Sequence, residues 1–183
     1  IETELLNRLK SVFGFPSGSA GNLTSGGSVA NMIALTAARD RYRIKAERIE
    51  RSVVYMSPQA HHCIRKALRI IGLEDIIIRN LELDERSRID AGKLSDTILR
   101  DKNNGLNPFL VVASAGTTDT GAVDPLEDIA GITRTNDLWF HIDGAYGGFF
   151  ILTDEKRDLM KGIESADSLV IDPHKSLFLP YGT

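Results

Sequence analysis

Apolar residues recur along this chain with two spacings that alternate. In some stretches they return every three or four positions, as at Leu5, Leu9 and Val12, and this spacing is typical of a helix with one buried side. Between these stretches lie short apolar runs that indicate buried strands. The pattern predicts helices over residues 2–13, 29–50, 57–71 (after an initial turn), 89–102, 126–135 and 154–161, and strands over residues 53–56, 76–79, 81–83, 109–115, 138–143 and 169–171.

The regular alternation of helix and strand predicts the fold class. Strands that alternate with helices form parallel sheets with helices packed on both faces. Residues 109–115 are apolar throughout, as expected of a strand buried on both faces of such a sheet. We therefore expect an α/β protein with a three-layer α/β/α architecture around a mostly parallel central sheet. The 183 residues are enough for one domain with a substantial core.

Composition and charge argue against several classes of protein. The net charge is −3 and no basic block occurs, so neither a nucleic acid nor an anionic membrane is indicated as a partner. No apolar run approaches the length that spans a bilayer. Cys63 is the one cysteine, and a single thiol cannot form an internal disulfide, which favours a reducing compartment such as the cytoplasm.

A polar segment follows the last predicted strand. Residues 169–171 run directly into Asp172-Pro-His-Lys175. A lysine at the exit of a buried strand is a candidate nucleophile, because its amine can form a Schiff base with a carbonyl group. The alternative is that Lys175 is a surface lysine in a loop. The polar residues upstream decide between these two interpretations.

A turn of small residues, Thr24-Ser-Gly-Gly-Ser28, precedes the second predicted helix. The first turn of a helix offers free backbone N–H groups and the positive end of the helix dipole, which together bind anions. Gly26 and Gly27 would let a phosphate approach the backbone, and Ser28 adds a hydroxyl. In the alternative interpretation, Ser25 caps the helix and the glycines only turn the chain.

Further polar residues follow other predicted strands. His61 lies at a strand-to-helix junction, Thr117 and Thr118 follow residues 109–115, and Asp143 ends the strand over residues 138–143. The carboxyl ends of parallel strands meet at one edge of a sheet, where α/β proteins bind ligands. Each residue also has an ordinary explanation as a polar helix start or turn residue. Adjacent histidines point in different directions and only one cysteine is present, so we predict no metal site.

Five short motifs occur together in this order: Thr24-Ser-Gly-Gly-Ser28, Gln59-Ala-His61, Gly116-Thr-Thr118, His141-Ile-Asp-Gly-Ala-Tyr146 and Asp172-Pro-His-Lys175. With them the chain resembles the group II amino-acid decarboxylases, which depend on pyridoxal phosphate and have the aspartate-aminotransferase-like fold (fold type I). Within that group it is similar to the aromatic-L-amino-acid decarboxylases. The resemblance extends from about residue 23 to residue 183. The chain departs from the family pattern at Val29, where the family usually has an acidic residue.

The resemblance implies roles for individual residues around pyridoxal phosphate. Lys175 would form the Schiff base with the cofactor, Asp143 would pair with the ring nitrogen, and His61 would stack on the ring, so these three are the expected catalytic residues. The remaining cofactor contacts that the resemblance implies are Gly26, Gly27 and Ser28 on the phosphate, Thr118 near the ring oxygen or Asp143, Ala145 on the other face of the ring, and His174 beside the lysine and the phosphate.

The function implied by the resemblance is decarboxylation of an L-amino acid, with an aromatic substrate expected, to the amine and CO₂. A glutamate decarboxylase, a sphingosine-phosphate-lyase-like enzyme or a cysteine desulfurase is an alternative within the same fold, and a non-catalytic binding module is an alternative of another class. The resemblance also implies a cytoplasmic homodimer that binds a small amino-acid substrate. Because the chain begins at Ile1 inside a predicted helix and ends just after the lysine motif, we expect residues 1–183 to be an incomplete large domain, with the substrate-binding segments outside it.

Overall fold

A parallel sheet of five strands forms the centre of the structure. The computed structural model describes residues 1–180. The strand order is β2-β1-β3-β4-β5, and every neighbouring pair is parallel. The strands are β1 (Ser52–Met56), β2 (Ile77–Asn80), β3 (Asn107–Ser114), β4 (Trp139–Asp143) and β5 (Ser168–Val170).

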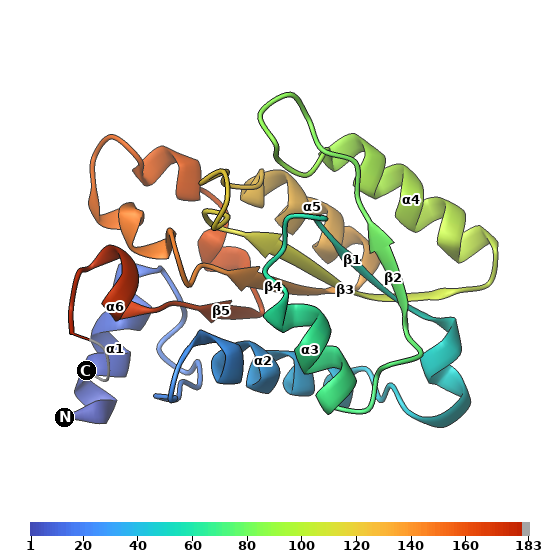
Figure 1. Cartoon of the computed structure of the whole chain (residues 1–183), viewed down its shortest axis with the longest axis horizontal. Coiled ribbons are helices and arrows are strands. Elements are labelled where there is room, and N and C mark those ends of the chain that lie inside the picture. The colour runs from blue at the N-terminus through green and yellow to red at the C-terminus, as the bar shows by residue number, and fades with distance from the viewer. Residues whose placement is uncertain (181–183) are drawn as a thin grey trace.

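Helices cover both faces of this sheet (Figure 1). One pair, α2 and α3, packs together on one face, and α4 and α5 lie on the opposite face. These three layers confirm the predicted α/β/α architecture. The helices are α1 (Glu2–Val12), α2 (Gly27–Arg41), α3 (Cys63–Ile70), α4 (Ala91–Asn103), α5 (Leu126–Asn136) and α6 (Pro173–Ser176), with short 3-10 helices η1 (Ala46–Arg51), η2 (Gly148–Leu152), η3 (Arg157–Met160) and η4 (Ile163–Ser165).

Each face of the sheet has its own hydrophobic core, because successive side chains of a strand point to opposite faces. On β1, Val53 and Tyr55 contact the core on the side of α4 and α5, whereas Val54 and Met56 contact the core on the side of α2 and α3. Full burial of one large apolar side chain contributes about 1.5–3 kcal/mol. Burial on both faces therefore fixes the positions of the central strands, and with them the segments that leave their carboxyl ends.

The order in which the strands join the sheet reverses once. From β1 the chain runs outward to β2 at one edge and then returns to place β3 on the other side of β1, followed by β4 and β5. The connection through α3 covers one face, and the connections through α4 and α5 cover the other. The segments that leave β1 and β3 therefore diverge. Open α/β sheets bind ligands in the crevice that forms at such a reversal, outside the carboxyl ends of the strands.

The helix predicted over residues 29–50 is wrong in its second half. α2 ends at Arg41, and the separate 3-10 helix η1 follows. The break has a backbone cause: Arg43 and Ala46 adopt the left-handed conformation, with φ values of 52° and 50°. Left-handed residues cannot continue a right-handed α-helix.

Two further predicted elements differ from the structure. Residues 81–83 form no strand, because only Leu83 makes a bridge, to Ile89 across a tight turn. Residues 154–161 form no α-helix. The chain there makes 3-10 turns, in which the Leu159 N–H donates to the Lys156 carbonyl three residues back. In the segment predicted over residues 57–71, the initial turn extends to His62 and the helix begins at Cys63. The ends of the other predicted helices and strands agree with the structure within about three residues.

Residues 1–180 contain no helix with the length and apolar character needed to cross a bilayer. Residues 181–183, which end the stretch over which the chain resembles the decarboxylases, lie outside the described residues.

A buried carboxylate joins α4 to the sheet. Asp101 accepts a 2.9 Å hydrogen bond from the Tyr55 hydroxyl and two hydrogen bonds from the Arg79 guanidinium, at 2.8 and 3.0 Å. The Asp101 side chain is 1% exposed. Burial, followed by the hydrogen bond to Asp101, raises the pKa of Tyr55, so its phenol remains a donor. The three side chains thus connect α4, β1 and β2.

We expect Asp101→Ala to lower the free energy of unfolding by about 3 kcal/mol, because it leaves a buried hydroxyl and a guanidinium without their acceptor. Urea denaturation of the full-length protein, followed by fluorescence, measures the change. The control is Asp96→Ala, which removes the same charge from the exposed face of the same helix and should change stability by less than about 0.5 kcal/mol. Equal effects of the two substitutions would contradict the importance of this network.

Candidate active site

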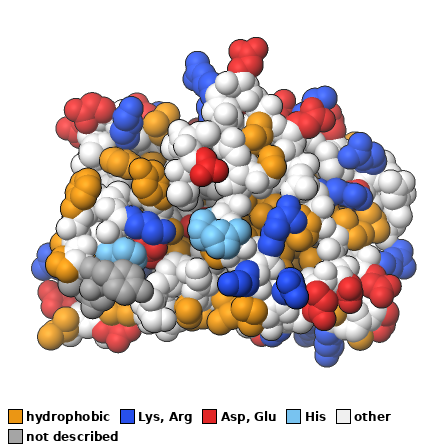
Figure 2. Space-filling view, in the orientation of Figure 1, with side chains coloured by type: hydrophobic (Ala, Val, Ile, Leu, Met, Phe, Trp, Pro, Cys, Tyr) orange, Lys and Arg blue, Asp and Glu red, His pale blue; other side chains and the backbone are white. Residues whose placement is uncertain are grey.

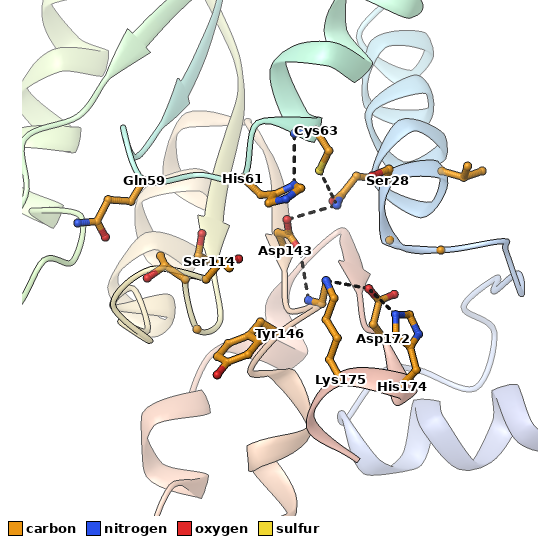
Figure 3. Close-up of a pocket in the computed structure, with 18 of the residues that line it drawn as sticks. Ser28, Gln59, His61, Cys63, Ser114, Asp143, Tyr146, Asp172, His174 and Lys175 are labelled. Carbon is orange, nitrogen blue, oxygen red and sulfur yellow. Dashed lines mark hydrogen bonds and ion pairs between the residues drawn. The ribbon is translucent and has the colours of Figure 1, made fainter. Parts of the chain in front are cut away.

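A cavity of about 390 Å³ opens at the carboxyl ends of β1, β3 and β4, where the strand order reverses. Its walls come from five separate segments: the start of α2, the turn before α3, the loop after β3, the end of β4 and α6 (Figure 3). The structure therefore brings the predicted strand exits together. The lining includes each predicted site residue: Gly26, Gly27, Ser28, His61, Thr118, Asp143, Ala145, His174 and Lys175.

The N-terminus of α2 forms one wall of this cavity. Gly26 is the N-cap, and its φ of 143° is a conformation that favours glycine. No side chain caps this helix in the described structure, so Ser25 does not have the capping role that the alternative interpretation required. The free N–H groups of the first turn and the positive end of a 15-residue helix therefore border the cavity. This arrangement can bind a phosphate.

Asp143 ends β4 and presents its carboxylate to the cavity (Figure 3). Its Oδ2 accepts a hydrogen bond from Asn31 Nδ2 at 3.3 Å, and its Oδ1 accepts one from the Ala145 N–H at 3.1 Å. One donor comes from α2 and the other from the turn after β4. The carboxylate is thus held in one orientation. Its oxygens have further lone pairs, so it can still accept a hydrogen bond from a bound molecule.

The His61 ring lies above Asp143 in Figure 3, just before α3 begins. Its Nδ1 accepts a hydrogen bond from the Cys63 N–H at 3.3 Å, which places the ring proton on Nε2. Burial is the largest cause that lowers the pKa of His61 below 6.5, and the charge of His62, whose ring centroid is 4.1 Å away, lowers it further. His61 is therefore a neutral, flat group at pH 7, suited to contact with an aromatic ring.

Lys175 lies on α6, a single helical turn, rather than in the loop of the alternative interpretation. Its Nζ is 3.0 Å from Asp172 Oδ2, and His174 Nε2 is 3.9 Å from the same oxygen. The Lys175 side chain is 38% exposed, so a bound molecule can reach the amine. A Cβ added at Gly27 would lie 2.8 Å from Asp172 Oδ2, which means that Asp172 packs against the start of α2. The amine and the anion site are therefore neighbours.

Two glycines bring the remaining walls close together. A Cβ added at Gly147 would lie 2.5 Å from the Ala115 carbonyl oxygen and 3.0 Å from Gly116 Cα. Only glycine permits this approach, so the turn after β4 packs directly on the end of β3. The packing positions Ala145 and Thr118 on the same cavity.

Histidine and charged side chains are exposed on the surface of the molecule that Figure 2 shows. Figure 2 shows histidine side chains at two places on the surface seen in Figure 1, one of them beside a basic and an acidic side chain.

Comparison with known proteins gives the family. The Pyridoxal-dependent decarboxylase conserved domain matches residues 1–183. This chain belongs to that family. An aromatic-L-amino-acid decarboxylase of Bacillus atrophaeus is 44% identical over 99% of the chain, and a cysteine sulfinic acid decarboxylase of Mus musculus is 38% identical over 97% of it. A solved structure from Vibrio parahaemolyticus superimposes with a TM-score of 0.91 at 31% identity, covering 97% of this chain and 41% of that one. It is described as the glutamate decarboxylase domain of a diaminobutyrate-pyruvate transaminase and L-2,4-diaminobutyrate decarboxylase.

This member of the family spans 37% of the length of each of the two curated relatives. Those relatives carry names with different substrates, one aromatic and one a sulfinic acid. The resemblance found in the sequence is confirmed by the family match, and the fold type by the superposition. The substrate follows from neither.

The residues present fit the group for which the pyridoxal-dependent family is named. Pyridoxal phosphate carries a phosphate, a ring nitrogen, an aldehyde and a flat ring. The start of α2 offers the anion site, and a Cβ at Gly26 would meet no atom within 4 Å, so a phosphate has room to approach the backbone. Asp143 offers an acceptor, Lys175 an amine and His61 a flat face, all on the same cavity.

The candidate residues taken from the sequence did not include Asn31 or Ser114, which also line the cavity. Asn31 contacts Asp143 from α2, one turn after Ser28, and is 1% exposed. An asparagine among the buried residues of an otherwise apolar helix face was the signal available, because a buried amide needs partners. Asp172 and Tyr146, which also line the cavity, stood in quoted motifs without an assigned role.

We expect His61 of the full-length protein, without added cofactor, to titrate with a midpoint below 6.5 in an NMR pH titration. The unfolded chain binds this proton more readily, so the His61 contribution to stability is complete above pH 6.5 and is lost as the pH falls. His62→Gln should raise the midpoint, because it removes a neighbouring charge. The control Lys156→Gln removes an exposed charge outside the cavity lining, and an equal shift in both variants would contradict the local explanation.

Proposed function

We propose that this chain is the cofactor-binding part of an enzyme that removes CO₂ from an L-amino acid with the help of pyridoxal phosphate. The observation that carries the proposal is the convergence on one cavity of a helix N-terminus, a held carboxylate and a reachable amine. These three groups come from α2, β4 and α6, which lie far apart in the sequence. The family match supports the same conclusion.

Each residue has a task that its position allows. The first turn of α2, with Gly26, Gly27 and Ser28, would bind the phosphate. Lys175 would hold the aldehyde carbon covalently through Nζ and release it to the substrate amine. Asp143 would accept a hydrogen bond from the ring nitrogen and so keep a proton on that atom. Pyridoxal phosphate, when bound, supplies a conjugated ring that accepts the electron pair left behind by CO₂.

The other lining residues would orient the ring. His61 would cover one face of it and Ala145 the other, while Thr118 would lie near its oxygen and His174 near the phosphate. Orientation would matter because the fold alone does not decide which bond of the substrate breaks. The choice of the carboxylate bond over the other bonds at the same carbon therefore depends on where the cavity holds the substrate carboxylate.

We propose an aromatic amino acid as the substrate. The relative that is 44% identical carries the name of an aromatic-L-amino-acid decarboxylase, which supports this choice over the sulfinic acid of the 38% identical relative. We also propose that residues 1–183 form an incomplete large domain and that the enzyme is a cytoplasmic homodimer.

We expect the full-length protein with pyridoxal phosphate to release CO₂ from one or more L-amino acids of a panel. Lys175→Ala should lower kcat/KM by about 10³-fold or more, because it removes a nucleophile and a proton carrier. Asp143→Asn should lower it by about 10²–10³-fold, because it removes charge stabilisation.

The controls remove the same groups outside the cavity lining. Lys161→Ala and Asp154→Asn alter exposed side chains and should leave kcat/KM within about twofold of the unaltered protein. Equal activity of Lys175→Ala and Lys161→Ala would contradict the proposed function. CO₂ release from acidic substrates alone would contradict the aromatic assignment and leave the reaction in place.

A further inference from the structure

A line of buried and half-buried polar side chains runs behind Asp143, on the side of the sheet covered by α2. Residues 139, 141 and 143 alternate along β4, so their side chains lie on the same face. Ser168 of β5 is the register partner of His141 and therefore lies beside it. Asn31 reaches this line from α2.

The line is continuous at hydrogen-bonding distance. Ser168 Oγ lies 2.8 Å from Trp139 Nε1 and 2.8 Å from His141 Nδ1. His141 Nε2 lies 2.8 Å from Asn31 Oδ1. Asn31 Nδ2 then lies 3.3 Å from Asp143 Oδ2. His141 is fully buried and Asn31 is 1% exposed, so the hydrogen bond between them is shielded from solvent.

The acceptor at the end of the line fixes the direction of the bonds. The Asp143 carboxylate only accepts, so Asn31 presents its NH₂ group to Asp143 and its Oδ1 to His141. An amide oxygen also only accepts, so His141 Nε2 carries a proton and donates it to Asn31 Oδ1. Burial, the largest cause, lowers the pKa of His141 to about 4, so the ring is neutral and its unprotonated Nδ1 accepts from the Ser168 hydroxyl. Ser168 Oγ in turn accepts from the Trp139 indole N–H.

The last bond connects two parts of the proposed site. Asn31 stands one turn after Ser28, so the helix that begins at the anion site also supplies the donor to the carboxylate. The distance between the start of α2 and Asp143 is therefore set by Asn31 and by what holds Asn31 in place. A cofactor that contacts both the helix start and the carboxylate must match that distance.

Resting on the proposed function, we propose that Asn31 and His141 are positioning residues: together they aim the Asp143 carboxylate and fix its separation from the phosphate-binding start of α2. Neither residue needs to touch the cofactor. Ser168 and Trp139 support this arrangement, because the Ser168 hydroxyl donates to His141 Nδ1 and accepts from Trp139 Nε1. The arrangement acts through a donor at Asn31 Nδ2, so a side chain of the same shape without that donor should fail.

Asn31→Asp has nearly the same shape as the native residue but places an acceptor against Asp143. The affinity of the full-length protein for pyridoxal phosphate, measured by fluorescence titration, should fall about 10- to 100-fold. The control Asn104→Asp adds the same charge at an exposed position at the end of α4 and should leave the affinity unchanged within about twofold. Equal affinities of the two variants would overturn the inference.

A second pair of variants tests whether the affinity for pyridoxal phosphate depends on the N–H group that His141 donates to Asn31. His141→Gln retains an N–H donor near the position of Nε2 and should retain most of the affinity, whereas His141→Phe fills the space without a donor and should lose about 10-fold or more. An effect of volume alone would reduce the affinity equally in both variants, and that result would overturn the inference.

A third measurement does not depend on the cofactor. In ¹⁵N-histidine-labelled protein without cofactor, the His141 signal, assigned through its loss in His141→Phe, should report the Nε2–H tautomer at pH 7, and Ser168→Ala should disturb it. An Nδ1–H or doubly protonated ring would overturn the inference while leaving the proposed function standing. Failure of the unaltered protein to bind pyridoxal phosphate, together with an Nε2–H tautomer, would instead overturn the proposed function and the positioning role of Asn31.

Discussion

The reversal of strand order beside β1 is the constraint on which the rest of this structure depends. Parallel strands send all their carboxyl ends to one edge, and the reversal makes the segments after β1 and β3 separate from each other there. The resulting crevice is the only place where the starts of α2 and α3, the end of β4 and α6 all meet the same cavity in the described structure. The two cores on either face of the sheet stabilise this arrangement, because they bury β1 and β3 on both sides.

Polar groups then convert the crevice into a site with fixed distances. The carboxylate at the end of β4 is held by one donor from α2 and one from its own turn. The amine on α6 is held beside the start of α2 by Asp172, which packs on Gly27. The carboxylate and the amine are therefore both positioned by contacts with α2. The hydrogen-bonded line from Trp139 through Ser168 and His141 to Asn31 connects that helix to β4 and β5.

Much of the fold could be predicted from local pattern. Apolar runs and helical spacing located the five strands and the longer helices, since those patterns report burial directly. The second helix was predicted to continue beyond residue 41, where the structure ends it. The left-handed residue at the break is Arg43, and not the glycine that usually indicates such a turn. The segment after β4 was predicted as a helix for its polar spacing, although its hydrogen bonds are of the 3-10 kind.

The site was predicted from residues that stand at strand exits, and the family resemblance supplied the chemistry that joined them. Asp143 and Lys175 were found in this way because their positions in the chain are themselves informative. Asn31 was not found, since its importance comes from a contact with a residue 112 positions away. Long-range polar contacts of this kind depend on the packing of α2 against β4 and β5, which no local pattern contains.

The most direct test of this account is chemical trapping in the full-length protein. Pyridoxal phosphate is added, the protein is reduced with borohydride and digested, and the peptides are analysed by mass spectrometry. We expect a pyridoxyl adduct on Lys175, because this amine borders the cavity beside the anion site. An unmodified Lys175, or an adduct on a different lysine, would contradict it.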